Sequence, residues 1–259
     1  MANKIITFFK LVKTLKNYPL YLKDYFGKIK NRYIFYKLRN GLRYKLRGGS
    51  TDRFILNEVW IHKSYNPKGF EIKSDDIIVD IGAHAGIFTI LASYYAKNGK
   101  VYAFEPMKEN YELLKENIKL NSAKNVEAIN KAVSNKSGKI KFYVSQTKNK
   151  GQNSLFKLDK SQKEEIVEKI SFKDFLRKIP KIDFLKIDCE GAEYEILFSL
   201  SKKELEKIKK ISMEFHNYGK YTGEDLAKFL HKNGFKIKLI NDGKMFGRIY
   251  ASNKSNPTL

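Results

Sequence analysis

The chain has 259 residues, of which 42% are hydrophobic and 14% aromatic, so it can bury one large core and is not a disordered protein. A single cysteine, Cys189, excludes an internal disulfide, and four scattered histidines argue against a zinc site. The formal net charge is +23, and the first 50 residues hold nine lysines and four arginines but only one acid, Asp24. This charge favours a polyanionic partner, either nucleic acid or an anionic membrane surface, unless it only reflects a lysine-rich composition.

The N-terminal segment is basic and predicts an amphipathic helix that ends near Pro19. Its apolar residues recur at helical spacing between lysines: Ile5, Phe8, Phe9, Val12 and Leu15. That pattern is typical of a helix lying on a membrane interface, and equally of a helix packed on the protein's own body. The lysines interrupt it too often for a signal peptide, and nowhere do the roughly 20 apolar residues of a membrane span occur. We therefore expect a cytoplasmic protein. Packing of this helix on the protein's own body is slightly favoured, and the alternative is a peripheral contact of residues 1–30 with an anionic membrane, at its inner face.

Further elements complete a basic N-terminal extension over residues 1–70. After a second helical segment, two alternating runs in YIFYKLRNGLRYKLR flank the dipeptide Asn40-Gly41. This dipeptide favours positive φ at both central turn positions, so we predict a β-hairpin. A helix should follow over residues 52–64. Residues 71–259 are then expected to form the main domain.

Strands alternate with helices from Asp76 onward, which predicts a mostly parallel sheet covered on both faces. The expected strands are residues 77–81, 100–105, 125–130, 181–188 and 210–216, and the expected helices are residues 86–97, 107–120, 191–200 and 222–233. Two final strands, residues 235–240 and 247–252, have no helix between them and must pair antiparallel. Residues 138–144 predict an extra strand, and the polar stretch from Ser145 to about Gln162 predicts a long surface loop. The predicted fold class is therefore α/β, with a Rossmann-like seven-stranded sheet.

The first strand of this sheet leads into a glycine loop within IIVDIGAHAGIFTI, residues 77–90. Open parallel sheets bind ligands at this place, and Gly82 and Gly86 let a ligand approach the backbone at the start of a helix. The loop lacks the lysine of phosphate-binding loops and the glycine spacing of the nicotinamide pattern. Its carboxylate, Asp80, suits a ligand with an ammonium group, and Glu105 at the next strand end can accept hydrogen bonds from a ribose diol. S-adenosylmethionine (SAM), a nucleoside that carries an amino acid, meets both requirements.

With these residues the chain resembles the FkbM family of class I SAM-dependent methyltransferases, which implies the seven-stranded class I methyltransferase sheet. The resemblance covers roughly residues 76–216, with weaker similarity upstream in KLRGGSTDRFILNEVW. It is carried by VDIGAHAGIFT, VYAFEPMKENYELLKENIKLN, NKAVSNKSG, FLKIDCEGAEYEIL and SMEFH, of which LKIDCEGAE is the most specific to the family. The chain departs from the family at His84, where asparagine is usual, and at Cys189, where an aliphatic residue is usual.

The resemblance implies an O-methyltransferase that acts on hydroxyls of sugars or natural products, and we expect a sugar, a glycan or a lipid-linked glycan as acceptor. The residues that it places around SAM are Asp80, Gly82, His84 and Gly86 at the methionine end, Glu105 at the ribose, and Asn130 and Ala132 at the adenine edge.

Residues for the chemical step are expected where the fourth and fifth parallel strands end. Lys186 and Asp188 share one face of the fourth strand, and Glu190 follows in the loop. Glu214 and His216 share one face of the fifth strand. Asp188 is the strongest candidate for the base or for orienting the substrate, although it could instead contact the amino group of SAM. For Lys186 a buried ion pair with Glu214 or Glu190 is favoured over catalysis, and for His216 a catalytic and a structural role are equally supported.

Other functions remain open on the sequence. An RNA methyltransferase, acting on a ribose hydroxyl or on a base, would explain the charge. However, DCEG after the fourth strand lacks the prolines of amino-group enzymes, and Cys189 lacks the proline context of cytosine-carbon chemistry. A SAM-fold protein without activity would be expected to lack the acids that are present here. The clustered carboxylates could hold magnesium, although nothing in the sequence requires a metal.

Overall fold

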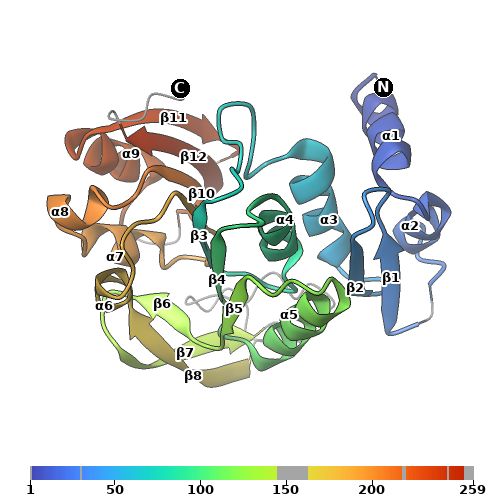
Figure 1. Ribbon diagram of the computed structural model, residues 1–259, viewed down its shortest axis with the longest axis horizontal. Coiled ribbons are helices and arrows are strands. Elements are labelled where there is room, and N and C mark those ends of the chain that lie inside the picture. Colours follow the sequence, from blue (N-terminus) through green and yellow to red (C-terminus); the bar gives the residue numbers. More distant parts are fainter. Residues whose placement is uncertain (1, 30, 145–162, 218–219, 244, 254–259) are drawn as a thin grey trace.

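The structure is a computed structural model that describes residues 2–29, 31–144, 163–217, 220–243 and 245–253. Its centre is a seven-stranded sheet in the order β11-β12-β10-β9-β3-β4-β5 (Figure 1). The strands are β3 (Ile77–Ile81), β4 (Lys100–Phe104), β5 (Val126–Ile129), β9 (Phe184–Ile187), β10 (Lys210–His216), β11 (Phe235–Asn241) and β12 (Phe246–Asn253). Neighbouring strands are parallel except at β12, which runs antiparallel to β10 and β11. The predicted fold class and its antiparallel C-terminal hairpin are therefore confirmed.

Burial explains why the strands differ in sequence. β3 and β9 are covered on both faces and are almost continuously apolar, whereas the edge strand β11 alternates. Exposed Lys236 and Lys238 on β11 protect this edge from further pairing. The helices of this part are α4 (Ile87–Tyr95), α5 (Lys108–Leu120), α6 (Phe172–Arg177), α7 (Glu193–Phe198), α8 (Lys202–Leu205) and α9 (Gly223–Lys232). α4 is buried from Ile87 to Ser93, because it lies between the sheet and the N-terminal part of the chain.

A second sheet has three strands, in the order β6-β8-β7. They are β6 (Ala132–Ser134), β7 (Gly138–Val144) and β8 (Lys163–Ser171). The extra strand predicted over residues 138–144 is β7, whereas β6 and β8 were not predicted. The polar loop predicted from Ser145 to Gln162 lies outside the described residues.

The N-terminal part contains two helices, a hairpin and a helix with a π-helical end. These are α1 (Ala2–Thr14), α2 (Tyr18–Tyr25), β1 (Tyr33–Lys37), β2 (Arg43–Arg47), α3 (Asp52–Asn57) and η1 (Glu58–His62). The hairpin is confirmed, but its predicted turn is wrong, because Gly41 has a φ of 95° while Asn40 has no positive φ. Residues 38–42 separate the paired strand ends, and the side chain of Asn40 accepts the amide hydrogen of Leu42 instead. Figure 1 shows this part at one end of the molecule and the β11–β12 hairpin at the other.

One hydrophobic cluster joins the two predicted parts of the chain. It contains Leu11 and Tyr36 from the N-terminal part together with Ile87 and Phe184 from the main sheet and its helix. The boundary at residue 70 stays a prediction, and the core crosses it. Among the described residues, no helix combines the length and the apolar character that a bilayer crossing requires.

Candidate active site

The predicted glycine loop follows β3 and is held by close contacts with its neighbours. The amide of Gly82 donates to the carbonyl oxygen of Phe104 at 3.0 Å. Gly82 has a φ of 79°, and a Cβ there would lie 1.7 Å from the carbonyl oxygen of Asp188. Gly86 has a φ of 81°, and its Cβ would lie 2.5 Å from a methyl carbon of Leu114. Both glycines are therefore required by the packing of the loop itself.

Asp80, the acid before the loop, is fully buried and is not among the residues that line the cavity described below. Its carboxylate accepts a hydrogen bond from Thr89 at 2.7 Å and lies 3.1 Å from the ammonium of Lys186. Lys186 also donates to the carbonyl oxygen of Gly82 at 2.6 Å and lies 4.0 Å from Asp188. Burial alone would lower the pKa of Lys186, but Asp80 and Asp188 outweigh burial and raise the pKa. The predicted ion pair exists, but its partners are these aspartates and not the predicted glutamates.

A cavity of about 290 Å³ opens beside the loop, at the carboxyl ends of β3, β4, β9 and β10. Its apolar lining consists of Ile81, Phe104, Pro106, Met107, Ala132, Val133, Ile140 and Phe142. Its acidic lining consists of Glu58, Glu105, Asp188, Glu190 and Glu214. Of the predicted cofactor residues, Gly82, His84, Glu105, Ala132 and Asp188 line the cavity. Gly86 and Asn130 do not line it, but Asn130 donates to the carbonyl oxygens of Glu105 and Pro106 and so shapes the turn after β4.

Glu105 lies at the end of β4, where a ribose is expected. Its buried carboxylate accepts hydrogen bonds from the amides of His84 at 2.7 Å and Met107 at 3.0 Å, and from the side chain of Asn110 at 3.4 Å. Burial raises the pKa of Glu105 to about 7, although these hydrogen bonds oppose the shift. A carboxyl group that is part protonated near neutral pH can both accept from and donate to a diol.

The predicted acids meet because β9 and β10 are parallel neighbours. Asp188, Glu190 and Glu214 line the cavity together, and Glu58 joins them from η1. The hydroxyl of Tyr65 donates to Asp188 at 2.7 Å, and the side chain of Asp188 remains 26% exposed. Burial, reinforced by the charges of Glu214 and Asp188, raises the pKa of Glu58 to about 7, and burial raises the pKa of Glu190 to about 8. Glu58 and Glu190 can therefore exchange protons near neutral pH.

His216 is buried among these acids. Its Nδ1 lies 3.1 Å from Glu193, and its Nε2 lies 3.5 Å from both Glu190 and Glu214. Burial alone would lower the pKa of His216, but the carboxylates raise it to about 12. We infer that the imidazolium is the counter-charge of the acids and not the base. Asp188, Glu214 and His216 each bring one ligand atom within 4.8 Å of the others. A divalent cation bound to Nε2 would require the neutral ring and would replace the contacts with Glu190 and Glu214, while Nδ1 could keep its contact with Glu193.

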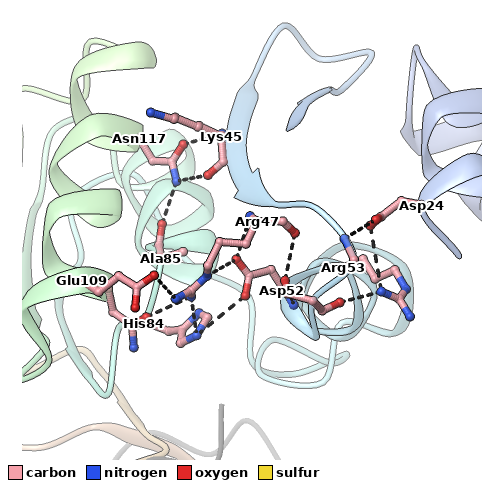
Figure 2. Close-up of polar contacts among 12 residues, drawn as sticks. Asp24, Lys45, Arg47, Asp52, Arg53, His84, Ala85, Glu109 and Asn117 are labelled. Carbon is pink, nitrogen blue, oxygen red and sulfur yellow. Dashed lines mark hydrogen bonds and ion pairs between the residues drawn. The ribbon is translucent and has the colours of Figure 1, made fainter. Parts of the chain in front are cut away.

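The N-terminal part forms another wall of the cavity. Its lining residues are Thr51, Phe54, Ile55 and Glu58. Figure 2 shows the polar contacts behind this wall, centred on the buried Arg47 of β2. The guanidinium donates from Nε to Asp52 at 3.0 Å and from Nη2 to Asn110 at 2.9 Å, and Nη2 lies 3.0 Å from Nε2 of His84. Because a guanidinium can only donate hydrogen bonds, Nε2 of His84 is the acceptor and the imidazole ring is neutral. Burial agrees with this, since it lowers the pKa of His84 to about 4.

A second link joins the same strand to the glycine loop. Asn117 of α5 accepts the amide hydrogen of Lys45 at 2.7 Å and donates to the carbonyl oxygens of Lys45 at 3.0 Å and Ala85 at 2.8 Å (Figure 2). The loop is therefore tied to β2 through both His84 and Ala85.

Comparison with known proteins agrees with this geometry. The family model described as the methyltransferase FkbM domain matches residues 80–237. The chain belongs to the FkbM methyltransferase family. It is an enzyme, and its cofactor is S-adenosylmethionine.

Several relatives of this FkbM-family enzyme are named methyltransferases. The chain is 24% identical to the 31-O-demethyl-FK506 methyltransferase FkbM of Streptomyces tacrolimicus, over 80% of this chain and 90% of that protein. It is 26% identical to Methyltransferase 1 of Beauveria bassiana, over 62% of this chain and 72% of that protein. It is 26% identical to the hexuronic acid methyltransferase AglP of Haloferax volcanii, over 56% of this chain and 58% of that protein. Among solved structures, it is similar to M. jannaschii TYW2 in complex with AdoMet, with 19% identity, 86% coverage of each chain and a TM-score of 0.48.

The cavity of this FkbM-family enzyme has the chemistry that SAM requires. The apolar residues around Ala132 suit an adenine ring, and Glu105 suits the ribose diol. The carboxylates near Asp188 suit the ammonium and sulfonium charges. Glu58, Tyr65 and Arg47 were not predicted, because they come from the N-terminal extension and no local pattern shows where that extension packs.

Proposed function

We propose that this enzyme methylates a hydroxyl of a neutral sugar or glycan, free or linked to lipid. The supporting observation is the acidic lining of the cavity, formed by Glu58, Asp188, Glu190 and Glu214 next to the predicted cofactor position. Several carboxyl groups in one cavity can accept and donate hydrogen bonds to the neighbouring hydroxyls of a sugar. The 31-O-demethyl-FK506 and hexuronic acid methyltransferases among the relatives support methylation of a hydroxyl-rich acceptor.

Asp188 is the residue that we place at the reacting hydroxyl. When bound, SAM supplies a methyl group that its sulfonium charge makes electrophilic. The acceptor oxygen loses its proton as it is methylated, and Asp188 is the cavity carboxylate that Tyr65 holds in place. Lys186, 4.0 Å away, stabilises its charged form. Asp188, which is 26% exposed, passes this proton on to solvent. Glu190, whose pKa is raised to about 8 by burial, is mostly protonated near neutral pH and can donate a hydrogen bond to the acceptor.

The same acids select against anionic acceptors. A phosphate or a sugar carboxylate in the cavity would lie against the carboxyl groups of Asp188, Glu190 and Glu214, which is unfavourable at close range, because the nearby cations, His216 and Lys186, are already engaged by the acids of the site. RNA is therefore disfavoured as the acceptor, and so is a uronic acid.

The test uses methyl-labelled SAM, the full chain, and separate pools of neutral sugars, uronic acids and RNA. We expect label in the neutral sugar pool. Asp188→Asn should lower its incorporation by about a hundredfold or more. Asp174→Asn makes the same chemical change on the exposed side of α6 and should leave incorporation unchanged. Label that appears only in the RNA or uronic acid pool would refute the proposed acceptor.

A further inference from the structure

The N-terminal part of the chain presents large apolar side chains to solvent. On α1, Ile6, Phe8 and Phe9 are 52%, 42% and 60% exposed. At the end of α2, Tyr25 and Phe26 are both more than half exposed and contact each other edge to face. We propose that these five residues, the docking surface, bind the enzyme to an anionic membrane.

In the structure, different residues of α1 serve the two roles that its sequence allows, which are packing on the protein's own body and contact with a membrane. Leu11 and Leu15, one helical turn apart, are buried in the core shared with the main sheet. Ile6 and Phe9 remain exposed, and Phe8 meets Tyr18 edge to face while staying part exposed. Packing on the protein's own body therefore accounts for the leucines and leaves the other apolar residues for a partner. Figure 1 shows α1 extending from the end of the molecule, where a flat surface can reach it.

The charge around the docking surface is positive throughout. The exposed basic residues of this part are Lys10, Lys13, Lys16, Lys23, Lys28, Arg32, Lys37, Arg39 and Arg43. Asp24, the single acid among the first 50 residues, is buried, where it accepts hydrogen bonds from the Tyr36 hydroxyl at 2.8 Å and the Gly49 amide at 2.6 Å. Among the described residues of the first 50, no carboxylate therefore lies on the surface to repel an anionic headgroup. Each lysine or arginine held near an anionic leaflet strengthens binding by about fivefold.

The apolar residues favour lipid over nucleic acid as the partner. Single-stranded nucleic acid binds basic grooves in which aromatic rings stack on bases, and the aliphatic Ile6 offers no such contact. A helix with lysines beside exposed aliphatic and aromatic side chains instead inserts its apolar residues at the headgroup boundary. Ile6 and Phe9 lie on the same side of α1 as Lys10 and Lys13, and Phe8 lies at the edge of this side, next to Tyr18.

The docking surface continues to the rim of the cavity. The guanidinium of Arg53 lies 6.0 Å from the ring centre of Tyr25 and 4.5 Å from that of Phe54. Phe54 is exposed and also lines the cavity. A docked enzyme would thus hold its cavity beside the membrane surface, although docking itself does not depend on which acceptor is methylated.

The test is sedimentation of the full chain with phosphatidylcholine vesicles, with and without phosphatidylglycerol. We expect binding to the vesicles that contain phosphatidylglycerol. The double variant Phe8→Ser/Phe9→Ser should bind them at least about tenfold more weakly, because two aromatic side chains no longer insert. Lys10→Glu/Lys13→Glu should weaken binding by a similar factor or more. Phe246→Ser is the matched control, since it removes a part-exposed ring from β12 at the opposite end of the molecule.

Thermal unfolding of each variant shows whether it is folded. The lysine substitutions should leave the melting temperature unchanged, and Phe8→Ser/Phe9→Ser should lower it only slightly, through the lost contact of Phe8 with Tyr18. Equal vesicle binding by wild type and Phe8→Ser/Phe9→Ser would overturn the proposal. A second result would also overturn it: polyuridylate displaces the wild type from vesicles, and the phenylalanine substitutions have no effect on vesicle binding. That result would assign the surface to nucleic acid. Methylation of a soluble sugar should be unaffected by Phe8→Ser/Phe9→Ser, so failure of docking and failure of the proposed reaction are distinguishable.

Discussion

Replacing Arg47 by methionine should weaken both the fold and the binding of SAM. Arg47 is buried and is the residue that neutralises Asp52, whose side chain is fully buried. Removing one partner of such a pair leaves an uncompensated charge, so we expect the free energy of unfolding to fall by about 3–5 kcal/mol. Domains are stable by roughly 5–15 kcal/mol, so the variant should still fold.

The effect on SAM follows from the second function of the guanidinium. It holds His84 of the glycine loop and Asn110, and both of these residues hold the carboxylate of Glu105. Loss of a charge-assisted hydrogen bond is worth about 1.5–3 kcal/mol, so the Kd for SAM should rise by at least about tenfold. Arg47→Lys keeps a charge near Asp52 but cannot form all of these contacts at once. It should therefore recover more of the stability than of the affinity.

Urea unfolding and isothermal titration with SAM measure the two effects. Lys45→Met is the matched control, because Lys45 lies on the same strand and pairs with a half-exposed glutamate, Glu116. That change should cost less than about 1 kcal/mol. If Arg47→Met lost stability yet bound SAM as tightly as the wild type, Arg47 would be structural only. A loss of stability no larger than that of Lys45→Met would refute the argument from buried charge.

Three further predictions concern the site itself. Gly82→Ala should abolish SAM binding, because its Cβ would lie 1.7 Å from a backbone oxygen; Gly41→Ala, with a similar positive φ and no atom within 4 Å, should bind SAM normally in the same titration. Asp188→Asn should lower kcat by about 10²–10⁴-fold with little change in the Kd for SAM, and a change confined to that Kd would indicate a cofactor contact instead. Burial opposes the charge on His216, but its carboxylate neighbours raise the pKa of the folded protein to about 12. The stabilisation of the fold by the protonated His216 is therefore complete below the ordinary pKa of about 6.5 and declines as the pH rises toward 12. The unfolding free energies of wild type and His216→Gln should therefore differ more at about pH 6 than at about pH 9, and an equal difference would contradict the pKa.

The central sheet was predictable because its strands are local features of the sequence. β3 and β9 are apolar except for Asp80 and Lys186, and the final hairpin lacks an intervening helix, so composition and connection length determine their places. β8 was missed for the opposite reason. Its sequence, KEEIVEKIS, is highly charged, and it is a strand because it pairs with β7 on one side and β6 on the other.

The site was predictable where its residues stand at strand ends and not elsewhere. Glu105 and Asp188 directly follow parallel strands and Glu214 lies near the end of another, and the carboxyl ends of these strands meet at one edge of the sheet. From the N-terminal extension, Glu58 lines the same cavity, and Tyr65 contacts its Asp188. Their positions depend on how η1 packs against the sheet, which no periodicity within either segment records. The loop contacts were also beyond the sequence, because the glycine spacing suggested room for a ligand whereas the structure fills that room at Gly82 with the Asp188 backbone.

The charge of this protein is divided between two places, and the division bears on its partners. The outer surface of the first 50 residues is basic, because their single acid, Asp24, is buried. The cavity is lined by carboxyl groups, including Glu58 from the following helix. A polyanion drawn to the outer surface would therefore be repelled at the point of methyl transfer. We therefore propose that the partner attracted by the net charge of +23 and the acceptor that enters the cavity are two different chemical groups. A neutral sugar carried on an anionic lipid or held in an anionic membrane satisfies both requirements, whereas RNA satisfies only the first.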